Sequence, residues 1–216
     1  MRAAPLIPLF ALGFAAAAAL GQAPHSHQHQ FGDADQWAAV FDDPKRDEWQ
    51  KPNEVVKALG LKPDALVADL GAGTGYFSVR LARLLPKGKI YAVDLEPEMV
   101  RHLASRAKRD ELPNVFAVQA AMDDARLPEK VDLVLLVDTY HHIEDRTRYF
   151  GRLKGSLAPG GRVAIVDFTM DSELGPPPRA RVSPEQVKRE LGKAGYEIAA
   201  EHDFLPNQYF LVFRPN

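Results

Sequence analysis

The chain has 216 residues, a length at which one domain can enclose a substantial hydrophobic core. Hydrophobic residues make up 46% of the chain and charged residues 26%, as in an ordinary soluble globular protein. A net charge of −2 gives no sign of a basic nucleic-acid-binding surface, and the lack of cysteine excludes disulfides, thiolate nucleophiles and cysteine-ligated zinc.

The N-terminus has the pattern of an export signal. Arg2 precedes an apolar, alanine-rich run at residues 6–20, which has the length of a signal-peptide core and is short for a membrane span. Ala19 and Gly21 form a small-x-small cleavage site, so residues 1–21 are predicted to be a signal peptide. The mature protein is then expected in the periplasm or outside the cell, with no stable membrane span. A retained membrane anchor and a cytoplasmic location are the alternatives.

A short polar segment follows, and then the folded domain begins. Residues 22–32 are rich in His and Gln and are predicted to be a disordered linker. Alternating histidines can bind a metal, but we predict no metal site here. The domain is expected over residues 33–216, with a first helix at 33–41, a charged turn-rich segment at 42–52 and a second helix beginning at Pro52.

Residues 66–78 combine an apolar run, an acid, three glycines and the start of a helix. The central sequence is Asp-Leu-Gly-Ala-Gly-Thr-Gly-Tyr at residues 69–76. Glycines let the backbone turn tightly and approach a ligand, and the following helix points its N-terminal amides at that turn. No lysine follows as a P-loop requires, and a dinucleotide-binding loop would place its third glycine one residue later. The pattern predicts a nucleotide-type site at the carboxyl edge of a parallel sheet, with a tight turn that binds nothing as the alternative.

The second strand supports this interpretation. Residues 89–94 are apolar and end in Asp94, about 20 residues after the glycines, where an acid can accept hydrogen bonds from a ribose. Together with the glycine loop, Asp94 predicts an adenosine-containing ligand.

Strands and helices alternate through the middle of the chain, which predicts parallel strands joined by right-handed crossovers. A helix capped by Ser183 and a hairpin with strands at residues 196–202 and 208–213 end the chain. The expected fold is α/β, a doubly wound Rossmann-like sheet of seven strands, mostly parallel with an antiparallel C-terminal hairpin. The basic run at residues 101–109 is interpreted as a solvated helix face. The remaining expected strands are near 65–70, 115–119, 132–138 and 162–168, and the helices near 75–85, 97–109 and 145–156.

The run at residues 69–76 closely resembles motif I of the class I S-adenosylmethionine-dependent methyltransferases. Residues 157–161, Leu-Ala-Pro-Gly-Gly, resemble the turn before the fifth strand of that family, and the terminal hairpin resembles its antiparallel seventh strand. The resemblance covers roughly residues 55–216. It implies S-adenosylmethionine as the cofactor and a small molecule as the methyl acceptor, because no added domain is present to hold a protein or a nucleic acid.

The resemblance also implies which residues bind the cofactor. The family often has an acid near the adenine where this chain has Ala121, so Met122 or Asp123 is expected to make that contact. Asp138, after the fourth strand, is expected near the methionine end. The implied cofactor-binding residues are Asp69, Gly71, Ala72, Gly73, Thr74, Gly75, Tyr76, Asp94, Leu95, Met122, Asp123 and Asp138.

Catalytic candidates follow the fourth strand. His141 and His142 titrate near neutrality and can act as a general base, which methyl transfer needs only when the acceptor is a poorly ionised OH, NH or CH group. Tyr140 is a similar candidate, and a structural role is the alternative for all three. Residues 42–52 resemble the N-terminal lid of small-molecule methyltransferases, and a helical lid is expected over residues 33–60. Trp49, Lys51, His202 and Tyr209 are expected to frame the acceptor.

Two other functions remain open at this point. One is an NAD(P)-binding oxidoreductase, which the glycine spacing and the terminal hairpin disfavour. The other is a secreted module that binds an adenosine compound without transferring a methyl group, which the export signal and the altered adenine motif suggest.

Overall fold

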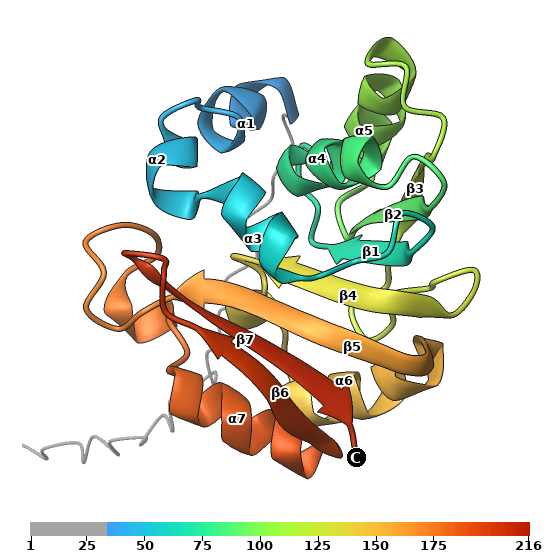
Figure 1. Cartoon of the computed structure of the whole chain (residues 1–216). Coiled ribbons are helices and arrows are strands. Elements are labelled where there is room, and N and C mark those ends of the chain that lie inside the picture. Colours follow the sequence, from blue (N-terminus) through green and yellow to red (C-terminus); the bar gives the residue numbers. More distant parts are fainter. Residues whose placement is uncertain (1–33) are drawn as a thin grey trace, which may run out of the picture.

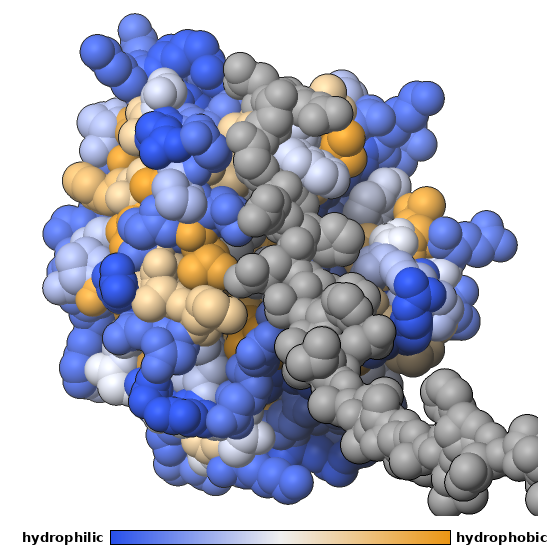
Figure 2. Space-filling model, turned by 180° about the vertical axis from the view of Figure 1, so that it is seen from behind, coloured by the Kyte–Doolittle hydropathy of each residue, from blue (hydrophilic) through white to orange (hydrophobic). Residues whose placement is uncertain are grey.

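The computed structural model describes residues 34–216, which form one sheet with helices on both faces (Figure 1). The predicted signal peptide and linker lie outside the described residues. Seen from behind, most of the surface is hydrophilic, and its apolar residues gather in several patches (Figure 2). Among residues 34–216, no helix has the length and apolarity that crossing a bilayer requires.

The sheet has seven strands in the order β3-β2-β1-β4-β5-β7-β6. Strands β1 to β5 are parallel, and β7 runs antiparallel between β5 and β6. The predicted fold class is therefore confirmed. Strands in the middle of the sheet are apolar runs because helices cover both of their faces. Their bounds are β1 Leu66–Leu70, β2 Lys89–Asp94, β3 Val115–Gln119, β4 Val131–Val137, β5 Leu157–Phe168, β6 Tyr196–His202 and β7 Gln208–Pro215.

Helices cover the two faces separately (Figure 1). One face packs against α3 (Pro52–Ala58) and α4 (Tyr76–Leu84), with α5 (Pro97–Arg109) over β2 and β3. The other packs against α6 (Arg146–Leu153) and α7 (Pro184–Lys193). The helices bury narrow apolar stripes on the sheet and expose the rest of their surface, as their amphipathic sequences require.

The N-terminal part contains one more helix than predicted. After α1 (Ala34–Phe41), the segment expected to be turns contains α2 (Arg46–Gln50). This helix closes because the Nε of Arg46 donates to the side chain of Gln50, one turn later, at 2.7 Å. It also packs against the end of β5 through Trp49. Tertiary contacts thus stabilise a helix that composition alone does not predict.

Strand β5 begins at Leu157, earlier than predicted. The Pro-Gly-Gly stretch at residues 159–161 stays in the strand because the pairing with β4 shifts its register there: Leu157 lies opposite Val131, and Arg162 opposite Leu133. Such a register shift accommodates residues that do not fit a regular ladder.

Candidate active site

The glycine-rich loop leaves β1 and turns over the end of β2. The N–H groups of Gly71 and Ala72 both donate to the carbonyl of Val93, at 2.8 and 3.0 Å. Gly73 and Gly75 have φ angles of +55° and +93°, in the left-handed region that favours glycine. The loop therefore requires glycine for its backbone path, and this path brings its amides to the carboxyl edge of the sheet.

Asp94, at the end of β2, supports this loop from the neighbouring strand. Its carboxylate accepts the N–H of Gly73 at 2.8 Å and that of Glu96 at 3.0 Å. Burial raises the pKa of Asp94, and hydrogen bonds from backbone N–H groups oppose that rise. Because a carboxylate offers about four acceptor positions, Asp94 can hold the loop and also accept hydrogen bonds from a ribose.

Asp69, at the end of β1, is an almost fully buried acid. It accepts a hydrogen bond from the hydroxyl of Ser78 in α4 at 2.6 Å. Burial raises the pKa of Asp69 to about 6, the hydrogen bond from Ser78 lowers it, and the nearby charge of Asp94 raises it further. A positively charged ligand group beside Asp69 would stabilise the ionised form.

The residues expected to meet adenine lie past the ends of β2 and β3. Leu95 and Met122 are large apolar side chains that are 41% and 57% exposed. Asp123 instead forms an ion pair with Arg152 of α6, whose charge lowers the pKa of Asp123. Leu95 and Met122 are therefore accessible to a flat apolar ring, whereas Asp123 is engaged by a helix.

Asp138, just past β4, connects three distant segments. Its φ angle of +54° is left-handed, and Nη2 of Arg46 in α2 lies 3.1 Å from one of its carboxylate oxygens. The other oxygen accepts a hydrogen bond from Gln208 of β7, which itself accepts one from Gln50 of α2 at 2.5 Å. Burial raises the pKa of Asp138 to about 7, and the charge of Arg46 opposes that rise.

His141 lies in the short 3-10 helix η1 (Tyr140–His142), beside the end of β5. Its Nδ1 lies 2.9 and 3.0 Å from the two carboxylate oxygens of Asp167, and the His141 and Asp167 side chains are only 6% and 2% exposed. A carboxylate only accepts hydrogen bonds, so Nδ1 carries the proton and Nε2 of the neutral ring keeps a lone pair. The ring of His142 packs beside it, with the centroids 4.1 Å apart. This arrangement suits a general base.

Tyr140 lies in a different environment from the two histidines. It is completely buried, and its hydroxyl donates to Glu190 of α7 at 2.7 Å. Arg146 lies over its ring at 5.3 Å. Burial and the charge of Glu190 raise the pKa of Tyr140 far above its ordinary range. Tyr140 thus belongs to the packing between η1, α6 and α7, and we do not retain it as a catalytic candidate.

The two acceptor candidates on the hairpin lie on opposite faces of the sheet. Tyr209 lies opposite Asp167 in the strand pairing and belongs to the core under α6 and α7. Its buried hydroxyl has no hydrogen-bond partner among the described residues, so a polar atom of a ligand could satisfy it. The ring of His202 packs 4.5 Å from that of Phe210, which belongs to the opposite core. Of the two, only Tyr209 is paired with Asp167, the residue that holds His141.

The two acceptor candidates on the lid also lie in different surroundings. Trp49 packs over Phe168 at the end of β5, with ring centroids 5.7 Å apart. Lys51 lies between α2 and α3, and its ammonium donates to the carbonyl of Phe204 at 3.0 Å. Trp49 is thus placed to form an apolar wall of an acceptor site, while Lys51 fastens the lid to the hairpin.

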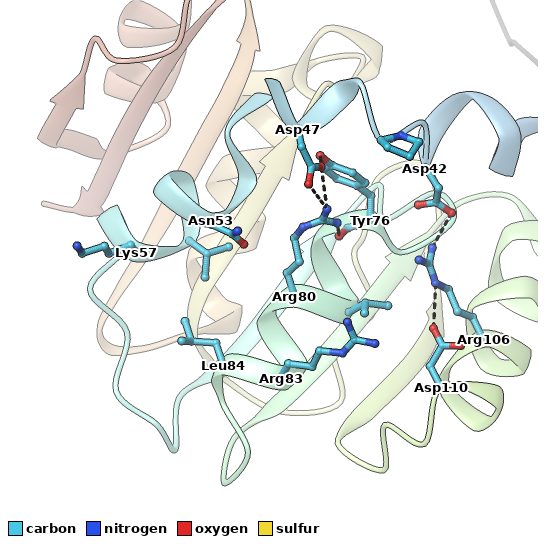
Figure 3. Close-up of a pocket in the computed structure, with 13 residues that line it drawn as sticks. Asp42, Asp47, Asn53, Lys57, Tyr76, Arg80, Arg83, Leu84, Arg106 and Asp110 are labelled. Atoms are coloured by element: carbon cyan, nitrogen blue, oxygen red, sulfur yellow. Dashed lines mark hydrogen bonds and ion pairs between the residues drawn. The ribbon is translucent and has the colours of Figure 1, made fainter. Parts of the chain in front are cut away.

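The outer side of the lid is tied to α4 across a groove of about 880 Å³ (Figure 3). Asp47 of α2 accepts hydrogen bonds from the hydroxyl of Tyr76 and from Arg80, the latter at 2.8 Å. Tyr76 is one of the expected cofactor-binding residues. Its ring has the guanidinium groups of Arg46 and Arg80 over it, at 4.2 and 3.9 Å. Tyr76 thus separates the groove from the Arg46 side of the lid.

A second outer contact involves the basic run on α5. Arg106 pairs with Asp42 of the lid at 2.7 Å and donates to the carbonyl of Thr74, in the glycine loop, at 2.8 Å. Figure 3 shows this arginine between Asp42 and Asp110. Its side chain is only 16% exposed, so the interpretation of the whole run as a solvated face is wrong for Arg106.

These residues fit the cofactor that the resemblance implies. The hydroxyl oxygen of Thr74 is buried without a hydrogen-bond partner among the described residues, in the middle of the glycine loop. Asp94 has acceptor capacity for a diol. Asp69 is a buried acid and Asp138 a partly buried one, and both suit an ammonium group. An adenosine joined to an amino acid satisfies each of these requirements.

Four functional candidates were not selected from the sequence. Arg46, Gln50 and Gln208 are polar residues whose importance comes only from contacts over long sequence distances. Asp167 carried a usable signal, because it ends an apolar strand at the same sheet edge as Asp94 and Asp138. Adding Asp167 to those acids would have predicted a partner for His141.

Comparison with known proteins identifies the domain. A family model described as a methyltransferase domain matches residues 67–161, which run from β1 to the start of β5. This range contains the glycine loop, Asp94, Asp138 and His141.

Two curated relatives match about half of this chain. The malonyl-[acyl-carrier protein] O-methyltransferase 1 of Ilyobacter polytropus is 29% identical over 109 residues, which are 50% of this chain and 40% of that protein. An uncharacterized methyltransferase of Mycobacterium tuberculosis is 34% identical over 107 residues, 49% of this chain and 52% of that one. The chain thus spans about half or less of the length of these relatives.

A solved structure matches over nearly its whole length. The crystal structure of an S-adenosylmethionine-dependent methyltransferase from Aquifex aeolicus has a TM-score of 0.77 and 27% identity, and the match covers 84% of this chain and 97% of that one. The fold, the family domain and S-adenosylmethionine as cofactor agree across these comparisons, and no finding favours an oxidoreductase or a module without transferase activity.

Proposed function

We propose that this chain, which belongs to the class I S-adenosylmethionine-dependent methyltransferases, transfers a methyl group to a hydroxyl oxygen of a small, largely apolar acceptor. One observation carries the proposal: the buried pair of His141 and Asp167 stands at the carboxyl edge of the sheet, past the strand end that carries Asp138. Such a base is needed for an acceptor that is poorly ionised at neutral pH.

His141 acts in this proposal as the general base. Asp167 accepts the proton of Nδ1, which holds the ring in one tautomer and stabilises the imidazolium that forms. The lone pair on Nε2 takes the proton of the acceptor hydroxyl as its oxygen gains the methyl group. When bound, the cofactor supplies an electrophilic methyl group and its own leaving group, so the protein's remaining task is alignment.

The surroundings of His141 favour an apolar acceptor with one polar anchor. Trp49 and Phe168 offer an aromatic wall, and Met170, in the loop after β5, is 45% exposed. Tyr209, which lies opposite Asp167 in the strand pairing, contributes a buried hydroxyl without a hydrogen-bond partner among the described residues. The Ilyobacter polytropus relative is itself named an O-methyltransferase, which supports oxygen as the methylated atom.

The test uses methyl-labelled S-adenosylmethionine and matched acceptors. Phenols and enols are compared with amines and thiols of similar shape, and formation of S-adenosylhomocysteine and of labelled product is followed by mass spectrometry. Transfer to hydroxyl acceptors that exceeds transfer to the matched amines and thiols, and that is lost in His141→Ala, is the expected result. Tight S-adenosylhomocysteine binding without turnover on any acceptor would instead indicate a binding module.

We also propose that the chain is exported. Support comes from Arg2, the apolar run at residues 6–20 and the small residues Ala19 and Gly21. In the native host, N-terminal sequencing of the mature protein should begin near Gln22. Replacing Leu12 by Arg should interrupt the apolar run and retain the protein in the cytoplasm. A soluble cytoplasmic wild-type protein that starts at Met1 would contradict this proposal.

A further inference from the structure

We propose that the groove between the lid and α4 binds a phosphorylated small molecule with an apolar body. The phosphate contacts Arg83, and the apolar part packs on Leu84. The groove lies on the outer side of Tyr76, so this ligand is neither the cofactor nor the methyl acceptor. The inference therefore goes beyond the proposed function and does not depend on it.

The groove has the size and shape of a small-molecule site. Its volume of about 880 Å³ lies within the range of about 300–1,000 Å³ that is typical of ligand pockets. Its lining comes from the segment around α2 and from α3, α4 and the end of α5. A ligand in the groove would therefore be contacted from several sides.

Positive charge is in excess at the groove. The cations are Lys57, Arg80, Arg83 and Arg106 of the lining and Arg109, which pairs with a lining acid from outside; the acids are Asp42, Asp47 and Asp110. Each of the three acids already pairs with an arginine. The five cations thus exceed the three acids by two charges, which a phosphate monoester dianion would match.

Arg83 is the arginine of the groove that no acid neutralises. It is exposed, and no hydrogen bond or ion pair reaches it from the part of the chain that the structure describes. Figure 3 shows its side chain extending into the groove between Arg80 and Arg106, whereas Lys57 points away. A guanidinium has five N–H donors in a fork that fits phosphate oxygens. Arg83 can therefore hold a phosphate group through several hydrogen bonds.

The two arginines on either side of Arg83 also retain donors. Arg80 uses Nη1 and Nη2 for its contacts with Tyr76 and Asp47, which leaves its Nε–H. Arg106 uses Nε and Nη1, which leaves Nη2. A phosphate at Arg83 could accept from these groups while both arginines keep their ties to the lid.

Apolar side chains lie beside these cations. Leu84 follows Arg83 at the end of α4 and is 50% exposed, and Val56 and Val79 line the groove with it. An inorganic ion would contact only the cations and leave Leu84 in water. A ligand that also carries an apolar body would cover Leu84, which favours an organic phosphate.

A merely solvated Arg83 makes a different prediction, and the chain offers a matched control. Arg189 of α7 is also an exposed helical arginine with no partner among residues 34–216, but its helix covers the other face of the sheet. If Arg83 were only solvated, Arg83→Met and Arg189→Met would have the same small effect on anion binding.

The experiment measures binding of three probes to the full chain by calorimetry at pH 8. Hexyl phosphate carries a dianion and an apolar chain, inorganic phosphate lacks the chain, and hexyl sulfate has only one charge. We expect hexyl phosphate to bind about tenfold more tightly than the other two. Arg83→Met should weaken hexyl phosphate binding by roughly 10–100-fold, and Arg189→Met should leave it within a factor of about 2 of wild type. Leu84→Ser should weaken hexyl phosphate by about 3–10-fold and leave inorganic phosphate unchanged.

Each part of the inference can be overturned separately. Equal effects of Arg83→Met and Arg189→Met on hexyl phosphate would mean that the anion is not held in the groove. Equal affinity for hexyl sulfate would mean that the ligand need not be a phosphate, and an unaltered affinity of Leu84→Ser would remove the apolar body. Vesicles of phosphatidylcholine with and without phosphatidic acid form the last arm. Wild-type protein that sediments only with phosphatidic acid vesicles and does not bind hexyl phosphate would mean that a lipid headgroup is recognised and not a soluble molecule.

Discussion

The carboxyl edge of the sheet has two halves that hold their buried acids in different ways. In the half formed by β1 and β2, Asp69 and Asp94 accept hydrogen bonds from Ser78 and from backbone N–H groups of the glycine loop. All of these donors come from one continuous stretch of the chain, residues 69–96. The cofactor half is therefore built by local backbone geometry.

The half formed by β4, β5 and β7 depends on side chains from distant segments. Asp138 is held by Arg46 and Gln208, which are 92 and 70 residues away in sequence. Asp167 holds His141, 26 residues away. This half carries Asp138, expected near the methionine end of the cofactor, as well as His141, and is called the acceptor half because the proposed general base lies in it. It is complete only when the lid and the terminal hairpin are packed in place. A site formed by a local backbone loop can be common to a whole family, because all members bind the same cofactor. A site formed by side chains from distant segments can vary from member to member, as the acceptor does.

The largest effect is expected from removing the proposed general base, which lies in the acceptor half. His141→Ala should lower turnover by roughly 10²–10⁴-fold, because no other group takes the acceptor proton. Affinity for S-adenosylhomocysteine should stay near that of wild type, since the cofactor half does not use His141. Steady-state kinetics and calorimetry measure the two quantities.

Two variants separate this effect from loss of structure. His142→Ala removes a neighbouring ring without removing the partner of Asp167 and should retain most activity. Asp167→Asn should lower turnover, because an amide stabilises the imidazolium that forms less than a carboxylate does. Near-normal turnover of His141→Ala would mean that transfer needs only alignment of the acceptor.

The next largest effect is expected from a substitution in the cofactor half. Asp94→Ala removes the acceptor offered to the ribose together with the support of Gly73. Hydrogen bonds to a charged acceptor contribute about 1.5–3 kcal/mol each, so affinity for S-adenosylhomocysteine should drop at least tenfold. Calorimetry of the variant gives the value, and Asp132→Ala, an exposed acid on β4, is the control. Unchanged affinity would mean that the ribose is held elsewhere.

The contrast between the two halves explains how much was predictable from sequence. The glycine loop, Asp69 and Asp94 were selected as candidates because their spacing along the chain reflects their geometry. His141 was selected by its place after a strand. Its partner Asp167 was not selected, although it stands at the end of a predicted apolar strand, and the pairing of β4 with β5 brings the two together.

The same distinction between local and distant contacts applies to the helices that could be predicted from the sequence. Ser183 predicted the start of α7, and its hydroxyl does accept the N–H of Gln186 at 3.3 Å. The short helix α2 was missed because much of its stability comes from contacts with β5 and β7, which its own sequence does not reveal. Arg46 was missed with it, since a charged residue in a turn-rich segment is usually solvated.

A smaller effect is expected when the buried charge of Asp69, in the cofactor half, is removed. Burial raises the pKa of Asp69 to about 6 from the 3.8 of an unfolded chain, so ionised Asp69 destabilises the fold at neutral pH. Asp69→Asn stays neutral and should raise the free energy of unfolding at pH 8 by about 1–3 kcal/mol.

The sign of this effect determines the pH at which it disappears. Between the two pKa values the folded state binds more protons than the unfolded state, so wild-type stability from this group falls as pH rises through that window. The advantage of Asp69→Asn should therefore shrink below pH 6 and vanish near pH 4. Urea titrations at several pH values measure it, and Asp64→Asn, at an exposed acid, should show no such trend. If the increase in the free energy of unfolding of Asp69→Asn were independent of pH, ionisation of Asp69 would not be its cause.

The smallest expected effect is that of Arg106→Met, which tests whether the glycine loop of the cofactor half depends on the lid. Arg106 links Asp42 of the lid to the carbonyl of Thr74 in the glycine loop. Arg106→Met should lower the free energy of unfolding by about 1–2 kcal/mol, because a partly buried carboxylate and a carbonyl lose their donor. Arg101→Met, on the exposed side of the same helix, should change it by no more than about 0.5 kcal/mol. If Arg106→Met also weakens S-adenosylhomocysteine binding several-fold while Arg101→Met does not, the glycine loop is ordered in part by the lid. Equal affinities would show that the loop maintains its shape alone, and the separation between a locally built cofactor half and a lid-dependent acceptor half would then be complete.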